Sequence, residues 1–500
     1  YFLIPAEIAS ERSDLMICGR SVFGAAPVKG QLMEDHYFGS IQPKVAEFMA
    51  ALDHELYRYG IPAKTKHNEV APNQFELAPL YEEMSLAIDH NLQTMDIMRR
   101  IAEDHGFVVL LHEKPFAGLN GSGKHMNWSI GDNTGVNYLE PSRSPLKNIS
   151  FLMTLGALLI GLNEYSGLLR AAISDAGNEH RMGSHEAPPA ILSIYLGEYL
   201  NEILDSIESA KTFTDKTMQT INHGIEVLPK VMKDISDRNR TSPIAFTGNK
   251  FELRALGSSA NGSDAATVMN MLCAYGYGQL IDRISAKKGD VKKSALIVLK
   301  DVLKETSAIR FEGNNYDEKW KVEAKKRKLF VVDTTPEALK FNLEESSIKL
   351  FESFNVLSKR ELESRIEIKF DAYTNTKIVE FKLAIDMIRR LILPAMLNQM
   401  NDLGAVYSHR QNIKLNCISI QTEFKRLDDL YSMLQTEMEN MNKFIDTVEN
   451  EDSAYERAYS CSTKGLDLLQ SLRDDVDEAE KFVSAEYWPL PSYDEILLLI

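Results

Sequence analysis

The chain has 500 residues, 44% of them hydrophobic and 26% charged, with a formal net charge of −16 and four cysteines. A chain of this length and apolar content buries a large core, which excludes a disordered protein and a miniature disulfide-stabilised fold. The acidic balance argues against nucleic acid and anionic membranes as partners. The cysteines lack the paired spacing of zinc or redox motifs. The chain begins at Tyr1 without a signal-peptide pattern, so we expect a cytoplasmic enzyme.

Residues 1–290 mix short strands, turns and helices, and they carry most of the glycines. Four segments have strand patterns: a hairpin at 67–77, the apolar run 107–111, the alternating stretch 124–130 and a strand at 245–255. Helical patterns fill 82–105 and 149–175, and the apolar stretch 149–162 inside the latter is too short to span a membrane. The pattern predicts a mixed domain of strands and helices.

From about residue 291 onward, long helical patterns with few turn signals replace the strands. Apolar residues between Phe424 and Val448 alternate at spacings of three and four, which is the seam of a helix packed lengthwise on another. A second seam runs from Leu469 to Val483, after a break near 460–465, so the two predict an antiparallel helical hairpin. A further helix at 378–397 should stop or kink at Pro394.

The segment 66–77 holds two carboxylates in a predicted hairpin. If Pro72 and Asn73 form a two-residue turn, Glu69 lies directly opposite Glu76. Like charges in that arrangement repel, and a divalent cation between them would offset the repulsion. The alternative is a surface hairpin whose carboxylates are both solvated.

A glycine-rich turn at 118–125 nearly matches the phosphate-binding loop pattern, but His125 stands where that pattern needs a hydroxyl. We therefore interpret it as a turn that leads into a strand. Alternation places His125, Asn127 and Ser129 on one face of this strand. A histidine there is either a metal ligand or simply hydrogen-bonded.

Three further segments carry charged residues close together in the sequence. In 250–254, alternation places Lys250, Glu252 and Arg254 on one face, which is either functional or an exposed salt-bridged surface. Arginines at 238 and 240 are of the kind that hold phosphate oxygens. The loop 180–189 offers an arginine and a glutamate that could close over a pocket. Together these groups suit phosphoryl transfer assisted by more than one divalent cation.

These segments occur in the order found in glutamine synthetases, and the sequence resembles that family over residues 1 to about 280. The phrases at 186–189 and 246–252, with the long helical tail, are similar to the type III branch. The matching motifs are Glu69-Val70-Ala71-Pro72-x-Gln74-x-Glu76, Asn120-Gly121-Ser122-Gly123-x-His125, Glu186-Ala187-Pro188, Arg238-Asn239-Arg240 and Glu252-x-Arg254.

The resemblance implies an α+β fold: a catalytic domain at 1–290, whose mostly antiparallel sheet forms an active-site barrel with a neighbouring subunit, and an all-α extension at 291–500. It implies homo-oligomeric stacked rings. It also implies a glutamate–ammonia ligase of nitrogen metabolism, which makes glutamine from L-glutamate, ammonium and ATP through a γ-glutamyl phosphate. The implied cofactors are ATP and two or more divalent cations, Mg²⁺ or Mn²⁺.

The resemblance also assigns roles to single residues. Glu69 and Glu76 match the ligands of one metal ion, and His125 and Glu252 match those of a second. The turn of Asn120 and Gly121, with Arg181, matches the glutamate site. The remaining matches are Asn127, Ser129 and Lys250 for nucleotide contacts, Arg240 and Arg254 for neutralising phosphoryl charge, and Glu186 for the flap that accepts a proton from ammonium.

Two departures from the family pattern stand out. The glutamates that precede the Tyr-Phe-Leu strand in the family, and its small N-terminal domain, are not in this sequence, so we expect this polypeptide alone to be catalytically crippled. Ala245 stands where many relatives carry an arginine, and Lys250 or a shifted register could compensate. The alternatives are a γ-glutamyl ligase that uses another amine and an inactive ring-forming homologue.

Overall fold

The computed structural model describes residues 1–32, 37–142, 144–183, 191–209, 220–221, 231–232 and 241–498. It divides into two compact units. The first unit comprises residues 1–122 and 367–500, and the second comprises residues 123–366. Each unit therefore takes residues from both sides of position 290, and the division into 1–290 and 291–500 stays a prediction.

The first unit contains a small antiparallel sheet in which β1 pairs with β4, as expected for the apolar run at 107–111. The helices α3 and α4 pack on one face through Phe48, Leu52 and Met98. The other face packs against Phe116 and the C-terminal α17. The elements before residue 122 are β1 (Phe2–Pro5), α1 (Ala6–Ser10), α2 (Ser13–Cys18), α3 (Pro43–Arg58), β2 (Ala63–Asn68), β3 (Phe75–Pro79), α4 (Met84–Asp104) and β4 (Phe107–Leu110).

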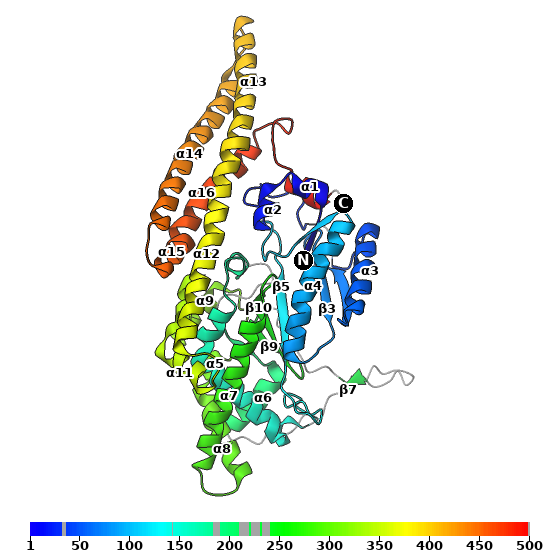
Figure 1. The fold of residues 1–500 in the computed structure, drawn as a ribbon, viewed down its shortest axis with the longest axis vertical. Helices are drawn as coiled ribbons and strands as arrows, with labels where there is room; N and C mark the ends of the chain where they lie inside the picture. The colour runs from blue at the N-terminus through cyan, green and yellow to red at the C-terminus, as the bar shows by residue number, and fades with distance from the viewer. Residues whose placement is uncertain are drawn as a thin grey trace. The chain divides into compact units, whose positions relative to one another are not determined.

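The helical tail contains the predicted long helices (Figure 1). Most of the predicted seam is buried in α14, although Phe424 at its start is exposed. Helix α14 packs along both α13 and α16, so the expectation of lengthwise helix packing is confirmed. The helix predicted at 378–397 was expected to stop or kink at Pro394. A π-helical turn at Ile388–Ile392, two residues before Pro394, interrupts the α-helical pattern there. The helices are α12 (Lys359–Met387), α13 (Leu393–Asn412), α14 (Ile418–Glu449), α15 (Ala454–Ser460), α16 (Leu466–Glu480) and α17 (Tyr493–Leu498).

A buried ionic cluster joins helix α12 to the N-terminal segment of the first unit. Glu380 accepts from Arg20 at 3.0 Å and lies 3.4 Å from the ammonium of Lys377. The side chains of Lys377 and Glu380 are at most 2% exposed. Burial and the nearby cations lower the pKa of His112 well below its usual value. Charges so deeply buried are stable only when paired, so this cluster fixes the position of α12 on its neighbours.

The second unit is built around the four-stranded sheet β5-β10-β9-β6, antiparallel except for the β9–β6 pair. Its strands are β5 (Gly123–Trp128), β6 (Ile194–Tyr195), β9 (Ile244–Phe246) and β10 (Phe251–Gly257), and a separate short pair is formed by β7 (Thr220–Ile221) and β8 (Val231–Met232). Its helices are α5 (Ile149–Ala172), α6 (Glu198–Ser209), α7 (Ser263–Ser285), α8 (Val291–Glu305), α9 (Glu318–Lys326), α10 (Thr335–Lys340) and α11 (Glu345–Ser353).

The central helix of this unit is α5, which packs closely on α7. Gly161 on α5 and Gly276 on α7 face main-chain atoms of the opposite helix, so any larger side chain at either position would force the two helices apart. Among the described residues, α5 is the one helix that is long and apolar enough to cross a membrane, and 83% of its apolar stretch is buried inside the protein. It is therefore accounted for as a core helix.

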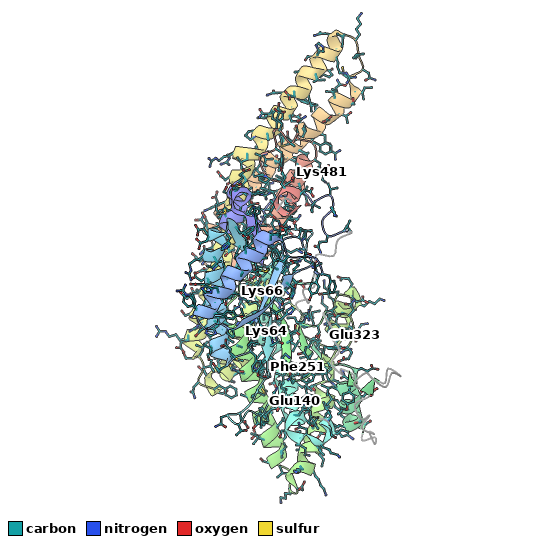
Figure 2. All side chains as sticks on the ribbon, turned by 90° about the vertical axis from the view of Figure 1, so that its right-hand side faces the viewer. Lys64, Lys66, Glu140, Phe251, Glu323 and Lys481 are labelled. Carbon is teal, nitrogen blue, oxygen red and sulfur yellow. The ribbon has the colours of Figure 1, made fainter. Side chains whose placement is uncertain are left out.

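The strand expected at 245–255 is two strands rather than one. Strand β9 ends at Phe246, and the chain turns through Gly248, which has a φ of +94°. It then returns as β10, whose first residue Phe251 (labelled in Figure 2) pairs with Phe246. The dipeptide Gly248-Asn249 is a turn signal that period-two alternation does not detect. Lys250 therefore lies in the turn, and only Glu252 and Arg254 share the strand face.

Candidate active site

The hairpin of β2 and β3 forms with a register different from the expected one. His67 lies opposite Glu76, and Asn68 lies opposite Phe75. Glu69 instead faces Gln74, whose carbonyl accepts from the Glu69 amide at 2.8 Å. The prediction of Glu69 directly opposite Glu76 is therefore wrong. The connection is longer than two residues because Gln74 closes a turn with Ala71, which leaves Asn73 at a positive φ of 57°.

The new register still brings the two carboxylates together, with a histidine between them. The Nε2 atom of His67 lies 2.9 Å from Glu76 Oε2, and its Nδ1 atom lies 3.7 Å from Glu69 Oε1. One donor atom from each residue falls within 4.8 Å of the others. Neighbouring ligands of one octahedral ion are about 3 Å apart when each bond is about 2.1 Å. The three side chains therefore lie near enough for one nitrogen of His67 and an oxygen of each glutamate to converge on a divalent cation after small side-chain rotations.

Sequence reasoning missed His67 as a member of this cluster. A signal was present, because His67 and Glu69 are two residues apart and so share a strand face. The preceding residue, Lys66, which is labelled in Figure 2, forms an ion pair with Asp53 of α3. This pair ties the opposite side of the strand to the helix and so directs His67 towards the two glutamates.

The turn at 119–122, which holds Asn120 and Gly121, is buried and held from several directions. The Asn120 amide donates to Gln31 Oε1 at 2.8 Å. The Gly121 carbonyl accepts from the side chain of Gln74 at 2.8 Å. The Ser122 amide donates to the carbonyl of Glu113, also at 2.8 Å. The turn is thus a rigid element whose main-chain groups have fixed directions.

A second histidine–carboxylate pair lies on the sheet of the second unit. Strand β10 pairs with β5 so that Glu252 is opposite Asn127 and diagonal to His125. The Nδ1 atom of His125 lies 2.9 Å from Glu252 Oε1. Arg254, two residues on, approaches the same oxygen at 3.5 Å. This spacing also fits two ligands of one divalent cation, with a guanidinium beside them.

The expected nucleotide-contact residues lie on two neighbouring segments. Strand β5 exposes His125 and Asn127, and Ser129 continues the exposed side directly after the strand ends. This alternation is as the sequence predicted. Lys250 lies in the turn between β9 and β10, and its ammonium is 3.4 Å from the Asn249 side chain. Their contacts to a nucleotide stay a prediction.

Arg181 is almost fully buried, at 3% exposure, which sequence reasoning did not indicate. Its guanidinium donates to the main-chain carbonyls of Arg254 and Leu256, both at 3.3 Å. It lies flat against Gly123, where any side chain would occupy the same space. The contact of Arg181 with the substrate carboxylate stays a prediction, and its position couples it to strand β10.

Three other residues complete the predicted set. Glu186 and Arg240 lie outside the described residues, so their roles stay predictions. Ala245 is buried in β9 and lies directly opposite Glu252. An arginine there would project from the same face of the sheet as Glu252, beside the second histidine–carboxylate pair.

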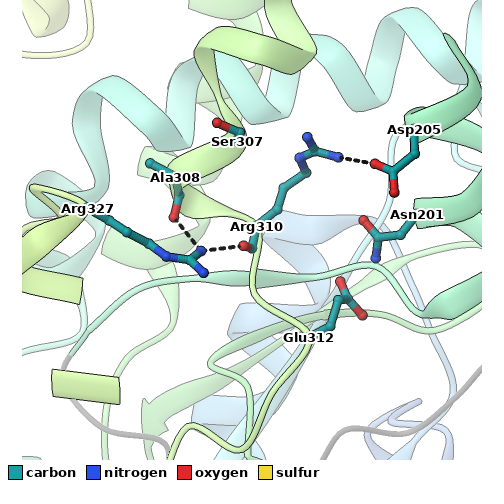
Figure 3. A pocket seen from close by; sticks show the side chains of 7 residues that line it. All are labelled: Asn201, Asp205, Ser307, Ala308, Arg310, Glu312 and Arg327. Carbon is teal, nitrogen blue, oxygen red and sulfur yellow. Dashed lines mark hydrogen bonds and ion pairs between the residues drawn. The ribbon is translucent and has the colours of Figure 1, made fainter. Parts of the chain in front are cut away.

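The second unit also contains a hollow of about 480 Å³ with a different character (Figure 3). Its charged groups bind one another: Arg310 lies 3.2 Å from Glu208, and Arg327 donates to the Arg310 carbonyl at 2.9 Å. Glu312 accepts from the Leu196 and Gly197 amides, and burial raises the pKa of its carboxyl group. These contacts hold the segment 307–312 against helix α6. We therefore interpret the charged groups of this hollow as structural and assign them no catalytic role.

Comparison with known proteins identifies the fold. The family described as "Glutamine synthetase, catalytic domain" matches residues 19–165, and "Glutamine synthetase C-terminal domain" matches residues 295–411. A glutamine synthetase of Bacteroides fragilis (strain YCH46) is 38% identical over 511 residues, covering 99% of this chain and 70% of the relative. The type-3 glutamine synthetase of Dictyostelium discoideum is 38% identical over 517 residues, covering 100% and 69%. Among solved structures, a GmaS/ADP complex (conformation 1) aligns at 15% identity with a TM-score of 0.38, covering 71% of this chain and 68% of that one. The assignment of the family does not rest on this structural similarity.

The chain belongs to the glutamine synthetase family, because the identity to these relatives extends over nearly its whole length. Within the family it is of the type III branch, as the match to the C-terminal domain and to the type-3 relative shows. It is a glutamate–ammonia ligase, which makes glutamine from glutamate and ammonia.

Proposed function

We propose that the chain carries out this ligation with ATP by activating the γ-carboxylate of L-glutamate as an acyl phosphate, which ammonia then attacks. The observation that carries the proposal is a pair of histidine–carboxylate clusters, one on the β2–β3 hairpin and one across the paired strands β5 and β10. His67, Glu69 and Glu76 would hold one divalent cation, and His125 with Glu252 would hold a second. Bound cations neutralise the charge that accumulates when two anions, phosphate and carboxylate, are brought together.

The remaining residues bind, orient and protect the reactants in this proposal. The turn of Asn120 and Gly121, together with Arg181, would bind the amino acid part of glutamate. Arg254 would stabilise negative charge on the transferring phosphoryl group, a role supported by its rigid position beside Glu252. Arg240 would act in the same way, and Asn127, Ser129 and Lys250 would contact the nucleotide.

An acyl phosphate is hydrolysed unless water is kept away from it. Ammonia must therefore reach the acyl phosphate before water does. Glu186 would assist this attack, because a carboxylate near the bound ammonium can accept the proton that ammonium must lose before it attacks. We further propose Mg²⁺ or Mn²⁺ as the cation, since carboxylate donors suit both ions and the imidazole donors favour the transition metal. Assembly as homo-oligomeric stacked rings in the cytoplasm also belongs to this proposal.

The test is a screen of amines with the full-length natural protein, ATP and glutamate. We expect phosphate release only when glutamate and ammonium are both present. A Glu252→Gln variant should lose at least a hundredfold in rate, whereas Glu140→Gln, at an exposed position on the loop after β5, should match the wild type. Release with a different amine would instead indicate a γ-glutamyl ligase. No release from a protein that still assembles would indicate an inactive homologue.

A further inference from the structure

Gln74 lies at the tip of the β2–β3 hairpin, between the two glutamates of the first cluster, and its side chain is buried. Its Oε1 atom accepts from the Ala71 amide at 3.1 Å. Its Nε2 atom donates to the Gly121 carbonyl at 2.8 Å and to Ser122 Oγ at 3.1 Å. The amide group therefore has one possible orientation, with the acceptor towards the hairpin and the donor towards the turn at 119–122.

The main chain of Gln74 is equally constrained. Its carbonyl accepts from Glu69, its amide donates to Ala71, and it forms an isolated bridge with Phe2 of β1. The position of this residue is thus determined by the hairpin and by the central sheet of the unit. Any displacement of the hairpin is transmitted through the Gln74 side chain to the Gly121 carbonyl.

From these contacts we propose that Gln74 is a positioning residue, which holds the glutamate-binding turn in register with the first metal cluster. This role rests on the proposed function, in which Asn120 and Gly121 bind glutamate and the hairpin binds a cation. Productive geometry in an active site tolerates errors of roughly 0.5 Å, and two reactant-binding elements on separate segments need a physical link to meet that tolerance. Gln74 provides it with three side-chain hydrogen bonds.

The test is the Gln74→Glu variant of the full-length protein. The glutamate side chain at position 74 has the same shape as the glutamine side chain, and one of its oxygens still accepts from the Ala71 amide. Its other oxygen replaces the NH₂ donor and repels the Gly121 carbonyl. We expect the KM for glutamate to rise at least tenfold, while the KM for ATP stays within twofold. The rise in unfolding midpoint on adding glutamate should shrink, because the shift produced by a ligand follows its affinity.

Two further variants separate positioning from general damage. Gln399→Glu makes the same chemical change on helix α13, where Gln399 acts as an acceptor from the Ser484 amide, and it should match the wild type. Ser122→Ala removes one of the two contacts made by the Gln74 donor. It should raise the glutamate KM by a smaller factor, and this variant tests the proposal even if Gln74→Glu fails to fold.

Two results would overturn the role of Gln74 alone: an unchanged glutamate KM in folded Gln74→Glu and in Ser122→Ala, or an equal rise in the KM of ATP and of glutamate. An absence of phosphate release dependent on glutamate and ammonium in the wild type would instead overturn the proposed function, and the role of Gln74 with it.

Discussion

Two glycines on helix α7 are expected to respond in opposite ways to the same substitution. A Cβ atom at Gly276 would lie 1.9 Å from the carbonyl oxygen and 2.7 Å from the Cα of Ala157 on α5, whereas a Cβ atom at Gly278 would meet no atom within 4 Å. Favourable carbon contacts lie at about 3.5 to 4.0 Å, so Gly276→Ala intrudes by about 1 Å on a rigid main chain. Gly278→Ala instead gains helix propensity without a clash.

The magnitudes follow from these distances. Alanine in place of glycine stabilises a helix interior by about 1 kcal/mol, so Gly278→Ala should stabilise by that amount. Overpacking costs about 1 to 3 kcal/mol. Because the clash involves main-chain atoms, the upper end applies and Gly276→Ala should destabilise by about 2 kcal/mol. A difference of about 3 kcal/mol corresponds to roughly 6 to 12 °C in unfolding midpoint for a domain of this size.

The assay is thermal unfolding of both variants and the wild type by circular dichroism under identical conditions. Gly278→Ala should unfold at or above the wild-type midpoint, and Gly276→Ala should unfold well below it. Equal shifts for the two variants, in either direction, would refute the close contact between α5 and α7.

Two other predictions concern buried charges of the first unit. Glu380→Gln leaves the buried Lys377 ammonium beside a neutral amide and should cost about 3 to 5 kcal/mol, measured by urea unfolding; a loss below 1 kcal/mol would contradict the buried pair. Burial, and then the neighbouring Glu437, raise the pKa of Asp475 from its ordinary value near 4 to about 6. The folded protein therefore retains a proton that the unfolded chain releases, and stability should fall as pH rises from about 4 to 6. Asp475→Asn should stabilise the protein at pH 7.5 and have little effect at pH 4, and a pH-independent difference would contradict this.

Much of the local structure could be predicted from the sequence because it depends on neighbouring residues. The seam of α14 and the exposed face of β5 both follow directly from periodicity. The pairing of His125 with Glu252 was expected from family motifs, and the geometry agrees with it. Periodicity reports which side chains of one element share a face, which was sufficient for α14 and β5 but not for the cross-strand pair of His125 and Glu252.

The register of the β2–β3 hairpin could not be predicted in this way. It depends on strand β1, where the Leu3 amide donates to the Asn73 carbonyl and the Tyr1 carbonyl accepts from Phe75. These partners are at least 70 residues away in sequence and leave no local pattern. The burial of Arg181 against Gly123 has the same origin, since only the folded sheet brings an arginine from one segment over a glycine of another.

The most direct test of the proposed chemistry follows an oxygen atom. L-Glutamate labelled with ¹⁸O in its γ-carboxylate is incubated with the full-length protein, ATP, ammonium and Mg²⁺, and the released phosphate is analysed by mass spectrometry. Activation of the carboxylate as an acyl phosphate requires one labelled oxygen to leave with phosphate for each glutamine formed. Phosphate without label, with glutamine still produced, would contradict the account.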